Sequence, residues 1–337
     1  MIDLRSDTVT RPTAAMLDFM FSAKTGDDVF GEDPTVNELE EYAAGLFGME
    51  AALYCPTGTM SNQIAIKAHT QPGDEVICDK TAHVYQYEGG GIAFNSGAQV
   101  RLLEGDRGRF TAAMVQAAIN PDDVHKANTS LVCLENTSNR GGGSYYDLSE
   151  IRLIRETCDR HGLSLHLDGA RLFNALVASG ESPAAHGRLF HSISICLNKG
   201  LGCPIGSILI GSRQFIKKSR RIRKVFGGGM RQAGFMAASG LYALKHHVER
   251  LAEDHAHARA ISEALKSKSF VKDILPVSTN IIIFELEENK SPAELVAQLK
   301  EQNIICLAIS PTQVRMVIHL DITPSDIQKV IEVINSL

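Results

Sequence analysis

Lys199 directly follows an apolar segment, and its chemistry depends on its surroundings. It stands in the stretch ISICLNKGLG (residues 193–202), with an apolar run before it and glycines and Pro204 after it. Lysine is almost never buried without a partner, so the side chain could simply extend to water. In a confined apolar site, however, desolvation favours the neutral amine, which attacks carbonyl groups and forms Schiff bases. The stretch therefore indicates either a solvated cation or a nucleophile.

Asp168 ends a second apolar segment, LSLHLD, and is followed by Gly169, Ala170 and Arg171. A carboxylate in this place is expected to be half buried, and it then needs a cation or an N–H group as its partner. An ion pair with Arg171, a cap on the next helix, or the protonated ring nitrogen of a bound ligand would each supply one.

The stretch PTGTMSN places Gly58 and Thr59 where a strand-like segment gives way to a helical one. A helix start offers free backbone N–H groups, a hydroxyl and the positive end of the helix dipole, which together suit a phosphate. The stretch lacks the GK[ST] ending of a P-loop and the GxGxxG of a dinucleotide site. A plain turn with a helix cap is the competing interpretation.

Strand-like and helical segments alternate through the middle of the chain, and they must position these three features. Asp147 and Glu150 have capping-box spacing at the start of one helical segment, and Gly162 ends it. Alternation of this kind predicts an α/β fold, in which helices flank both faces of a mostly parallel sheet. Strands are predicted at 51–55, 74–78, 98–104, 130–135, 163–168, 192–197 and 206–211, and helices at 58–69, 111–119, 147–162 and 169–180.

The C-terminal part of the sequence has a different order of elements. A continuous helical pattern runs from 240 to 268, and apolar strand-like segments follow at 279–286, 304–308 and 314–320. Ser291 and Thr323 each begin a further helix as N-cap residues with proline next. We therefore predict a large domain of residues 1–250 and a smaller α/β domain of residues 251–337, with residues 1–40 packing at an interface.

The bulk composition limits the classes of function. The chain has 337 residues, 44% of them hydrophobic, and a net charge of -5, which argues against binding to a nucleic-acid backbone. The basic run at 220–224 is interpreted as a solvated helix face. The seven cysteines form no CxxC pair, and the first residues, MIDLRSDTVT, do not resemble a signal peptide. A cytoplasmic protein without a membrane span is therefore expected, and no metal site is predicted.

The three features are expected to share one edge of the sheet. In an open parallel sheet, ligands bind beyond the carboxyl ends of the strands. Gly58, Glu135, Asp168 and Lys199 all lie where predicted strands end. One ligand would use all three features, because it needs a carboxylate for its pyridine nitrogen, an amine for its aldehyde and a helix start for its phosphate. That ligand is pyridoxal 5′-phosphate (PLP).

Eight stretches of the sequence occur in the same order in a known family. They are LRSDTVTRPT (4–13), GDDVFGEDPTVNELE (26–40), PTGTMSN (56–62), LEN (134–136), LDGARLFNA (167–175), KGLGCPIGS (199–207), GGGMRQAG (227–234) and VRMVIHLD (314–321). On these stretches the chain resembles the L-threonine aldolases, which are PLP enzymes of fold-type I in the aspartate-aminotransferase-like superfamily. The resemblance covers nearly the whole length.

The resemblance implies a role for each matching residue. Lys199 would carry PLP as a Schiff base, and Asp168 would hold its pyridine nitrogen protonated. Gly58 and Thr59 would bind its phosphate. The resemblance further implies that His83 stacks on the ring and acts as a base, and that His125 lies near the substrate hydroxyl. Arg171 would lie near the cofactor's phenolic oxygen and the substrate, and Arg231 would lie near the phosphate. Ser6 and Arg315 would bind the substrate carboxylate.

The implied reaction is the retro-aldol cleavage of L-threonine, L-allo-threonine or related β-hydroxy amino acids to glycine and an aldehyde. His83, or a water held by His83 and His125, would take the proton of the β-hydroxyl group. The family also implies a homotetramer, a dimer of dimers with sites shared across the interface. Two positions depart from the family pattern, since Asn198 stands where serine is common and Ser138 stands where histidine is common.

Other functions stay open at this point. A β-eliminating lyase or an aminotransferase of the same fold would use the same PLP site and would release a keto acid instead of glycine. A PLP-binding protein without turnover would share the site residues, and only an activity measurement separates it. A Schiff-base aldolase that uses Lys199 without PLP would leave Gly58, Thr59 and Asp168 without a role.

Overall fold

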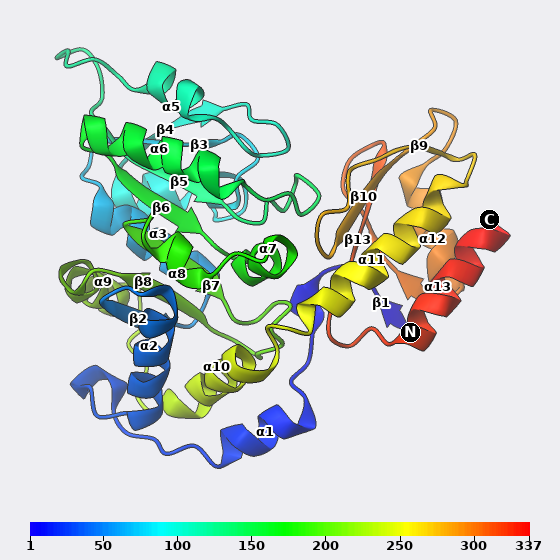
Figure 1. Ribbon diagram of the computed structural model, residues 1–337, viewed down its shortest axis with the longest axis horizontal. Helices are drawn as coiled ribbons and strands as arrows, with labels where there is room; N and C mark the ends of the chain where they lie inside the picture. The colour runs from blue at the N-terminus through cyan, green and yellow to red at the C-terminus, as the bar shows by residue number, and fades with distance from the viewer.

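The main sheet has seven strands and is mostly parallel, as the sequence predicts (Figure 1). The computed structural model describes residues 1–337. The strand order is β2-β8-β7-β6-β5-β3-β4, and only β8 runs antiparallel to its neighbours. The strands are β2 (Ala51–Cys55), β3 (Glu75–Asp79), β4 (Gln99–Leu103), β5 (Thr129–Glu135), β6 (Ser164–Asp168), β7 (Ser192–Cys196) and β8 (Ser207–Gly211).

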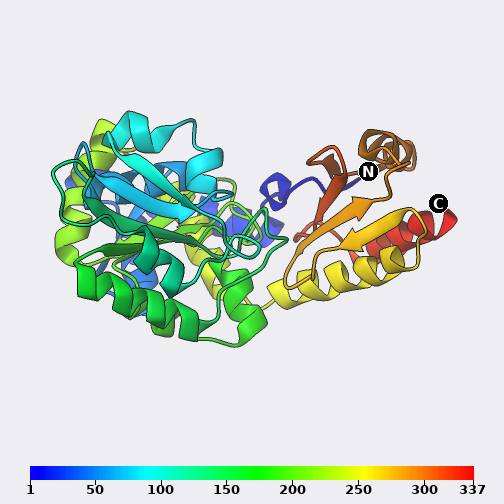
Figure 2. The same ribbon diagram turned by 90° about the horizontal axis from the view of Figure 1, so that it is seen from above.

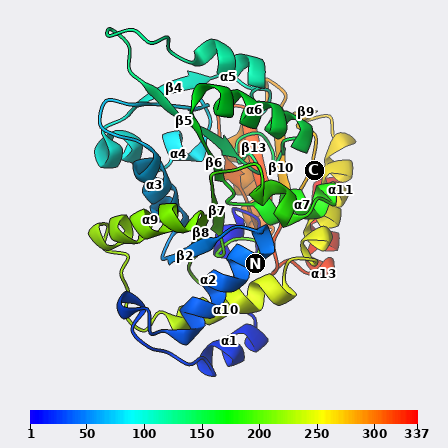
Figure 3. The same ribbon diagram turned by 60° about the vertical axis from the view of Figure 1, so that its left-hand side comes forward.

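Helices cover both faces of this sheet, because the connections between parallel strands cross over it. Figure 3 shows α3 and α9 on one side of the strands and α6 and α7 on the other. No helix is both long and apolar enough to cross a membrane. The helices of this part are α1 (Ala14–Phe21), α2 (Pro34–Phe47), α3 (Gly58–His69), α4 (His83–Gln86), α5 (Ala112–Ala118), α6 (Leu148–His161), α7 (Leu172–Ser179), α8 (Pro183–Gly187), α9 (Arg213–Val225) and α10 (Gly234–His246), with short turns η1 (Asp7–Val9), η2 (Asp28–Phe30) and η3 (Ile92–Ser96).

The C-terminal part forms a separate α/β layer, which Figure 2 shows beside the main sheet. Its antiparallel sheet has the order β12-β13-β10-β9. Thr323 begins the last helix with a complete capping box, since its side chain and that of Asp326 each bond the other residue's backbone N–H. The elements are α11 (Leu251–Lys266), β9 (Val271–Ile274), β10 (Ile281–Leu286), α12 (Pro292–Glu301), β12 (Leu307–Ala308), β13 (Gln313–Val317) and α13 (Pro324–Ser336).

The first residues of the chain belong to this smaller part. Strand β1 (Ile2–Asp3) pairs in parallel with β11 (Ile304–Ile305), and Ile2 and Leu4 are buried in the core beneath α11 and α13. The prediction that assigns all of residues 1–40 to the large domain is therefore wrong for the first four residues. A two-residue strand with a partner some three hundred positions away leaves no local pattern in the sequence.

Two local predictions also need correction. The helical pattern at 240–268 forms two helices, α10 and α11, with a turn between them that the imidazole of His247 ties to the Leu201 carbonyl at 2.8 Å. Asp147 precedes α6 but makes no capping bond. Glu150 does not close the predicted capping box either, since it accepts the backbone N–H of Ala112 at 2.7 Å. Tertiary contacts decide both cases. Gly162 does end α6 in the left-handed conformation, as predicted.

Candidate active site

A cavity of about 200 Å³ lies at the carboxyl ends of β6 and β7, where a ligand of a parallel sheet is expected. It brings together five of the residues that the sequence pattern selects. They come from the start of α3, the start of α4, the end of β6 and the loop after β7. The lining residues are Thr8, Thr57, Gly58, Thr59, Asn62, His83, Asp168, Ala170, Cys196, Asn198 and Lys199.

Lys199 lines this cavity and is half buried, so it does not extend freely to water. Its ammonium nitrogen lies 3.3 Å from the Cys196 sulfur. The loop then turns sharply, since the Gly202 N–H donates to the Lys199 carbonyl at 2.8 Å. Gly202 has a φ of 79°, a conformation that suits glycine. The strand and this turn together fix the lysine at the edge of the sheet.

Asp168 has one carboxylate oxygen with a partner and one without. The side chain is only 2% exposed. Its Oδ1 accepts the Ala170 N–H at 3.1 Å, whereas its Oδ2 is buried and has no hydrogen-bond partner. The alternative ion pair with Arg171 does not form. A buried carboxylate oxygen without a partner is rare, and here it marks a place for a donor on a ligand.

Arg171 instead pairs with Asp7, which the sequence pattern does not select. Its Nε and Nη2 donate to the two carboxylate oxygens at 2.6 and 2.8 Å, and both side chains are buried. The Asn280 amide donates to the same carboxylate at 3.3 Å. Burial acts to raise the pKa of Asp7, but the Arg171 guanidinium outweighs it and the net shift is downward. The pair anchors η1 against the main sheet.

The start of α3 offers a cradle for an anion. Thr57 caps the helix, with its hydroxyl accepting the Met60 N–H at 3.1 Å. The first amides of a helix have no acceptor within the helix, and those of Gly58 and Thr59 border the cavity. A Cβ on Gly58 would lie 2.4 Å from the Cys196 sulfur. Only glycine therefore fits at this point of contact between α3 and the end of β7.

His83 begins α4 and is held by two glutamates. Its backbone N–H donates to Glu135 at 2.9 Å, and its Nδ1 lies 3.0 Å from Glu88 Oε1. Burial lowers the pKa of His83, but the hydrogen bond to Glu88 and the charge of Asp168 raise it more, so the net shift is upward. Burial, with the nearby Asp168 charge, raises the pKa of Glu135 to about 7. The geometry gives the imidazole a fixed direction.

Arg315 and Ser6 lie at the junction between the two parts of the molecule. Arg315 Nη2 donates to the Arg5 carbonyl at 3.1 Å, next to Ser6, and its Nη1 donates to Asn139 at 3.0 Å. Its Nε is buried without a partner. Burial lowers the pKa of Arg315, and the nearby Arg171 adds to this effect. An unused N–H of Arg315 therefore lies near a second guanidinium, that of Arg171, and this arrangement suits a small carboxylate.

His125 and Arg231 do not join the cavity of their own chain. His125 lies in the loop before β5, at the amino end of that strand, whereas the cavity lies at the carboxyl ends; this loop extends away from the sheet in Figure 1. Its side chain is 85% exposed and contacts Asp123 at 2.9 Å. Arg231 is 58% exposed and pairs with Asp27 at 2.9 Å. A role for either residue stays a prediction, and it requires a second subunit.

Several side chains in and around the site are missed by sequence reasoning. Glu88 and Asn62 contact each other at 2.9 Å beside His83, and Asn139 bonds Arg315. Asn139 stands in the ENTSN stretch, only one residue after Ser138. Ser138 itself is buried in a turn, where its hydroxyl accepts the Gly141 N–H at 3.2 Å. Polar residues at the ends of predicted strands can be found from the sequence pattern. Glu88 lies in an irregular segment that has no such pattern.

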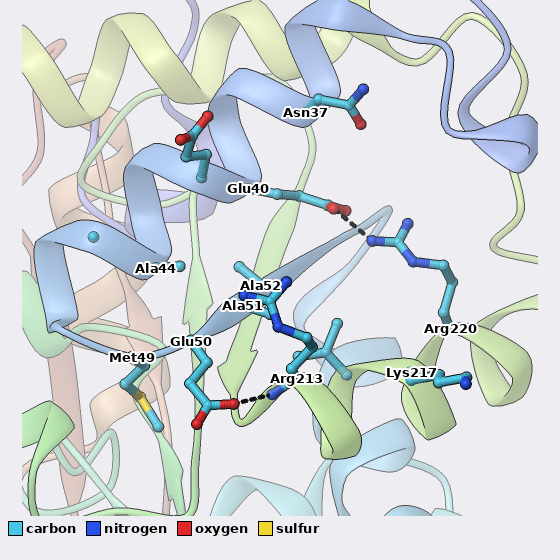
Figure 4. Close-up of a pocket in the computed structure, with 13 residues that line it drawn as sticks. Asn37, Glu40, Ala44, Met49, Glu50, Ala51, Ala52, Arg213, Lys217 and Arg220 are labelled. Atoms are coloured by element: carbon cyan, nitrogen blue, oxygen red, sulfur yellow. Dashed lines mark hydrogen bonds and ion pairs between the residues drawn. The ribbon is translucent and has the colours of Figure 1, made fainter.

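A larger cavity lies elsewhere. It has a volume of about 710 Å³ and opens between α2, β2 and α9. Figure 4 shows that Glu40 pairs with Arg220 there and that Glu50 accepts the backbone N–H of Arg213. None of the residues selected for chemistry lines it. Size alone therefore does not locate the site.

The basic run at 220–224 is not simply a solvated helix face. Arg223 is buried, with Nη2 donating to Asp28 and Nη1 to the Tyr54 carbonyl, each at 2.6 Å. Arg220 pairs with Glu40. The prediction is wrong for these two residues, since α9 uses them to hold α2 and η2 against the sheet.

The architecture is shared with a solved structure of Leishmania major threonine aldolase. The TM-score is 0.87 at 21% sequence identity, and the match covers 100% of this chain and 99% of the other. Among curated proteins, the chain is 44% identical over 331 residues to the low specificity L-threonine aldolase of Escherichia coli O157:H7, covering 98% of this chain and 97% of the relative. It is 39% identical over 333 residues to low-specificity L-threonine aldolase 1 of Arabidopsis thaliana, covering 97% and 93%. The chain matches the beta-eliminating lyase family over residues 3–289 and belongs to that family.

Proposed function

We propose that this protein is a PLP-dependent carbon–carbon lyase that cleaves L-threonine, L-allo-threonine and related β-hydroxy amino acids to glycine and an aldehyde. One observation carries the proposal. The unpartnered Oδ2 of Asp168, the amine of Lys199 and the start of α3 border a single cavity. These are the three partners that a pyridinium, an aldehyde and a phosphate require. The names of the two curated relatives support the same activity.

The residues of the cavity fit PLP. Asp168 Oδ2 would accept the pyridine N–H, the first amides of α3 with the Thr59 hydroxyl would hold the phosphate, and Lys199 would hold the aldehyde. When bound, the cofactor supplies an electron sink for the bond that breaks. Asn198 also lines the cavity, so its amide is available to the cofactor.

The substrate carboxylate binds to Arg315, with Ser6 and Arg171 alongside. A fixed carboxylate would orient the α-carbon in the site and so select the bond that breaks. Asn139 holds Arg315 in place through its side-chain oxygen. His83 then takes the proton of the β-hydroxyl as general base, and its raised pKa strengthens it in that role.

The family also favours a second candidate, β-elimination, because its description is that of a beta-eliminating lyase. The two reactions differ in the bond that breaks and in their products. Glycine with acetaldehyde from L-threonine identifies the aldolase, whereas a keto acid without glycine identifies the eliminating enzyme. The same measurement on L-allo-threonine ranks the substrates, with D-threonine as the negative control.

The test of the site uses Lys199→Ala. The PLP-loaded wild type should absorb visible light, and borohydride should abolish the absorption and link the cofactor covalently to the chain. In Lys199→Ala both the absorption and the covalent link should be missing, and cleavage should fall by at least about 1000-fold. A variant that keeps the absorption and full activity contradicts the proposal.

We further propose a cytoplasmic homotetramer whose sites are shared between subunits. Seven free, buried cysteines support a reducing compartment, and the exposed Phe21 and Phe30 near the chain start support an interface. His125 and Arg231 then act in a neighbouring subunit's cavity. The test mixes two inactive variants, Lys199→Ala and Arg231→Ala, after reversible dissociation. Recovered activity in the mixed assembly supports sharing, whereas no recovery with intact assembly contradicts it.

A further inference from the structure

A chain of hydrogen bonds runs from His83 down into the interface between α3 and the sheet. Glu88 Oε1 accepts from His83 Nδ1 at 3.0 Å and from the Asn62 amide at 2.9 Å. On the far side of Asn62, its Oδ1 lies 3.2 Å from His166 Nε2. The chain continues through the Ser192 hydroxyl, which lies 2.8 Å from His166 Nδ1 and 2.8 Å from His69 Nε2.

The Glu88 carboxylate fixes the direction of every bond in this chain. It is fully buried and also accepts from the Gln63 amide at 2.6 Å, so three donors converge on an acceptor-only group. The Asn62 amide must donate to it, because the reversed orientation would set a carbonyl oxygen against a carboxylate oxygen. Asn62 therefore turns its own oxygen toward His166.

The orientation of Asn62 then determines which atoms donate and which accept at His166, Ser192 and His69. His166 is 0% exposed, and burial lowers its pKa to about 4, so the ring is neutral at physiological pH. Its Nε2 must carry the proton to reach the Asn62 oxygen, which leaves Nδ1 as an acceptor for the Ser192 hydroxyl. The Ser192 oxygen is then free to accept from His69 Nε2. A hydroxyl group can join two neutral imidazoles in this way, because it donates one hydrogen bond and accepts another.

We infer that Glu88 is a positioning residue that holds His83 in one tautomer, with the proton on Nδ1 and with Nε2 directed at the reacting hydroxyl, and that Asn62, His166 and Ser192 keep Glu88 in place through the chain below it. The hydrogen-bond chain stands on its own geometry, and only its catalytic consequence rests on the proposed aldolase activity. The arrangement resolves which ring nitrogen is the base. It also gives the buried polar layer beneath the cavity a role that packing does not require.

The charged groups that face His83 come from four elements. Glu88 follows α4, Asp168 ends β6, Glu135 ends β5 and Lys199 follows β7. The two nearest anions favour the protonated ring and Lys199 opposes it. Replacing Glu88 by glutamine removes one anion and keeps an oxygen that can accept from Nδ1. The pKa of His83 should therefore fall, and the acid limb of the kcat/KM profile should move to lower pH.

The test compares Glu88→Gln and Ser192→Ala with the control Ser207→Ala. Ser207 lies in the same polar layer, 2.7 Å from the Ser61 hydroxyl, but outside the chain. Glu88→Gln should lower kcat by about tenfold or more, with KM changed by less than about threefold. Ser192→Ala should lower kcat by about two- to fivefold, and Ser207→Ala should leave the profile unchanged.

A readout independent of turnover is the nitrogen-15 NMR spectrum of histidine-labelled, PLP-loaded enzyme, with His83→Asn used to assign the signal. Wild type should show His83 protonated on Nδ1 and His166 on Nε2, and Ser192→Ala should leave both of these protons in place and give mixed tautomers for His69 alone. A proton on His83 Nε2, or an acid limb unmoved in a folded Glu88→Gln, overturns the inference. If wild type cleaves no β-hydroxy amino acid, the proposed function fails. The tautomer spectrum still tests whether the hydrogen-bond chain has the inferred donors and acceptors.

Discussion

At β6 and β7 the two faces of the main sheet differ sharply in chemistry, although the same strands make both. Side chains alternate along β6 and β7, so each strand contributes to both faces. One face packs against α2, α6, α7 and α10 and is apolar, with Leu165, Leu167, Ile193 and Ile195 in one continuous core. The other lies under α3 and is polar, with His166, Asp168, Ser192 and Ser194.

The two faces therefore have different roles, one in the stability of the fold and the other in the chemistry of the site. The apolar face stabilises the fold by burying hydrocarbon side chains. These side chains must pack closely, but the interaction between them is not directional. The polar face contributes hydrogen bonds whose donors and acceptors must match one by one. Fixed direction is what a site needs and what an apolar core cannot give, so the cavity forms where the polar layer meets the strand ends.

The largest expected effect comes from the polar face. Asp168→Asn should lower kcat by about 1000-fold, because a neutral amide does not keep the pyridine nitrogen protonated. The fold should persist, since Ala170 can still donate to the remaining carbonyl oxygen. The measurement is turnover of L-threonine together with PLP retention after dialysis. Activity within tenfold of wild type would mean that the polar face does not tune the cofactor.

On the apolar face, Leu167→Ala should cost about 2–5 kcal/mol in the free energy of unfolding, because it leaves a cavity in a fully buried core. Leu167 directly precedes Asp168, so the pair isolates the two faces at adjacent positions. The measurement is denaturant unfolding of the PLP-loaded protein, with kcat determined on the folded fraction. A 1000-fold loss of kcat with unchanged stability would erase the distinction between the faces.

The polar face should also make the fold sensitive to acid. Burial lowers the pKa of His166 to about 4 and that of His69 to about 3, while unfolded histidine titrates near about 6.5. As the pH falls from 6.5 toward 4, the unfolded chain binds protons that the folded chain does not, so the free energy of unfolding decreases.

The comparison uses His69→Gln and Leu167→Ala, with Tm measured between pH 7.5 and pH 4.5. His69→Gln should show a weaker decrease of Tm with acid than wild type, even if its Tm at pH 7.5 is lower. Leu167→Ala should shift Tm without changing the slope. Parallel curves for all three proteins would show that the buried histidines are not the cause.

The smallest expected effect is that of Ser194→Ala. Ser61 contacts the hydroxyls of both Ser194 and Ser207, at 2.6 and 2.7 Å, so loss of one partner leaves the other. The free energy of unfolding should fall by about 1 kcal/mol, and kcat should change by less than about threefold. A change in kcat as large as that for Asp168→Asn would extend the functional part of the polar face across β7.

Local pattern and strand order determine which residues of the site the sequence can predict. Asp168, Lys199 and Gly58 could be assigned to one edge, because the carboxyl ends of parallel strands must meet there. Glu88 could not be found in this way, since it lies in an irregular segment and its position depends on α3 packing over the sheet. The Asp7–Arg171 pair joins positions 164 apart, which no periodicity reports. The turn between α10 and α11 interrupts a pattern that is typical of one helix, because contacts with the Leu201 loop decide it.

Strand β1 has a mechanical consequence for the whole chain. The chain connects the smaller part to the main sheet twice, by the segment that leaves β1 and by the turn between α10 and α11. A body held at two points rotates about the line that joins them and not freely. Any such rotation carries Arg5 and Ser6 with Arg315, so these groups move as one unit relative to Asp168, Arg171 and Lys199.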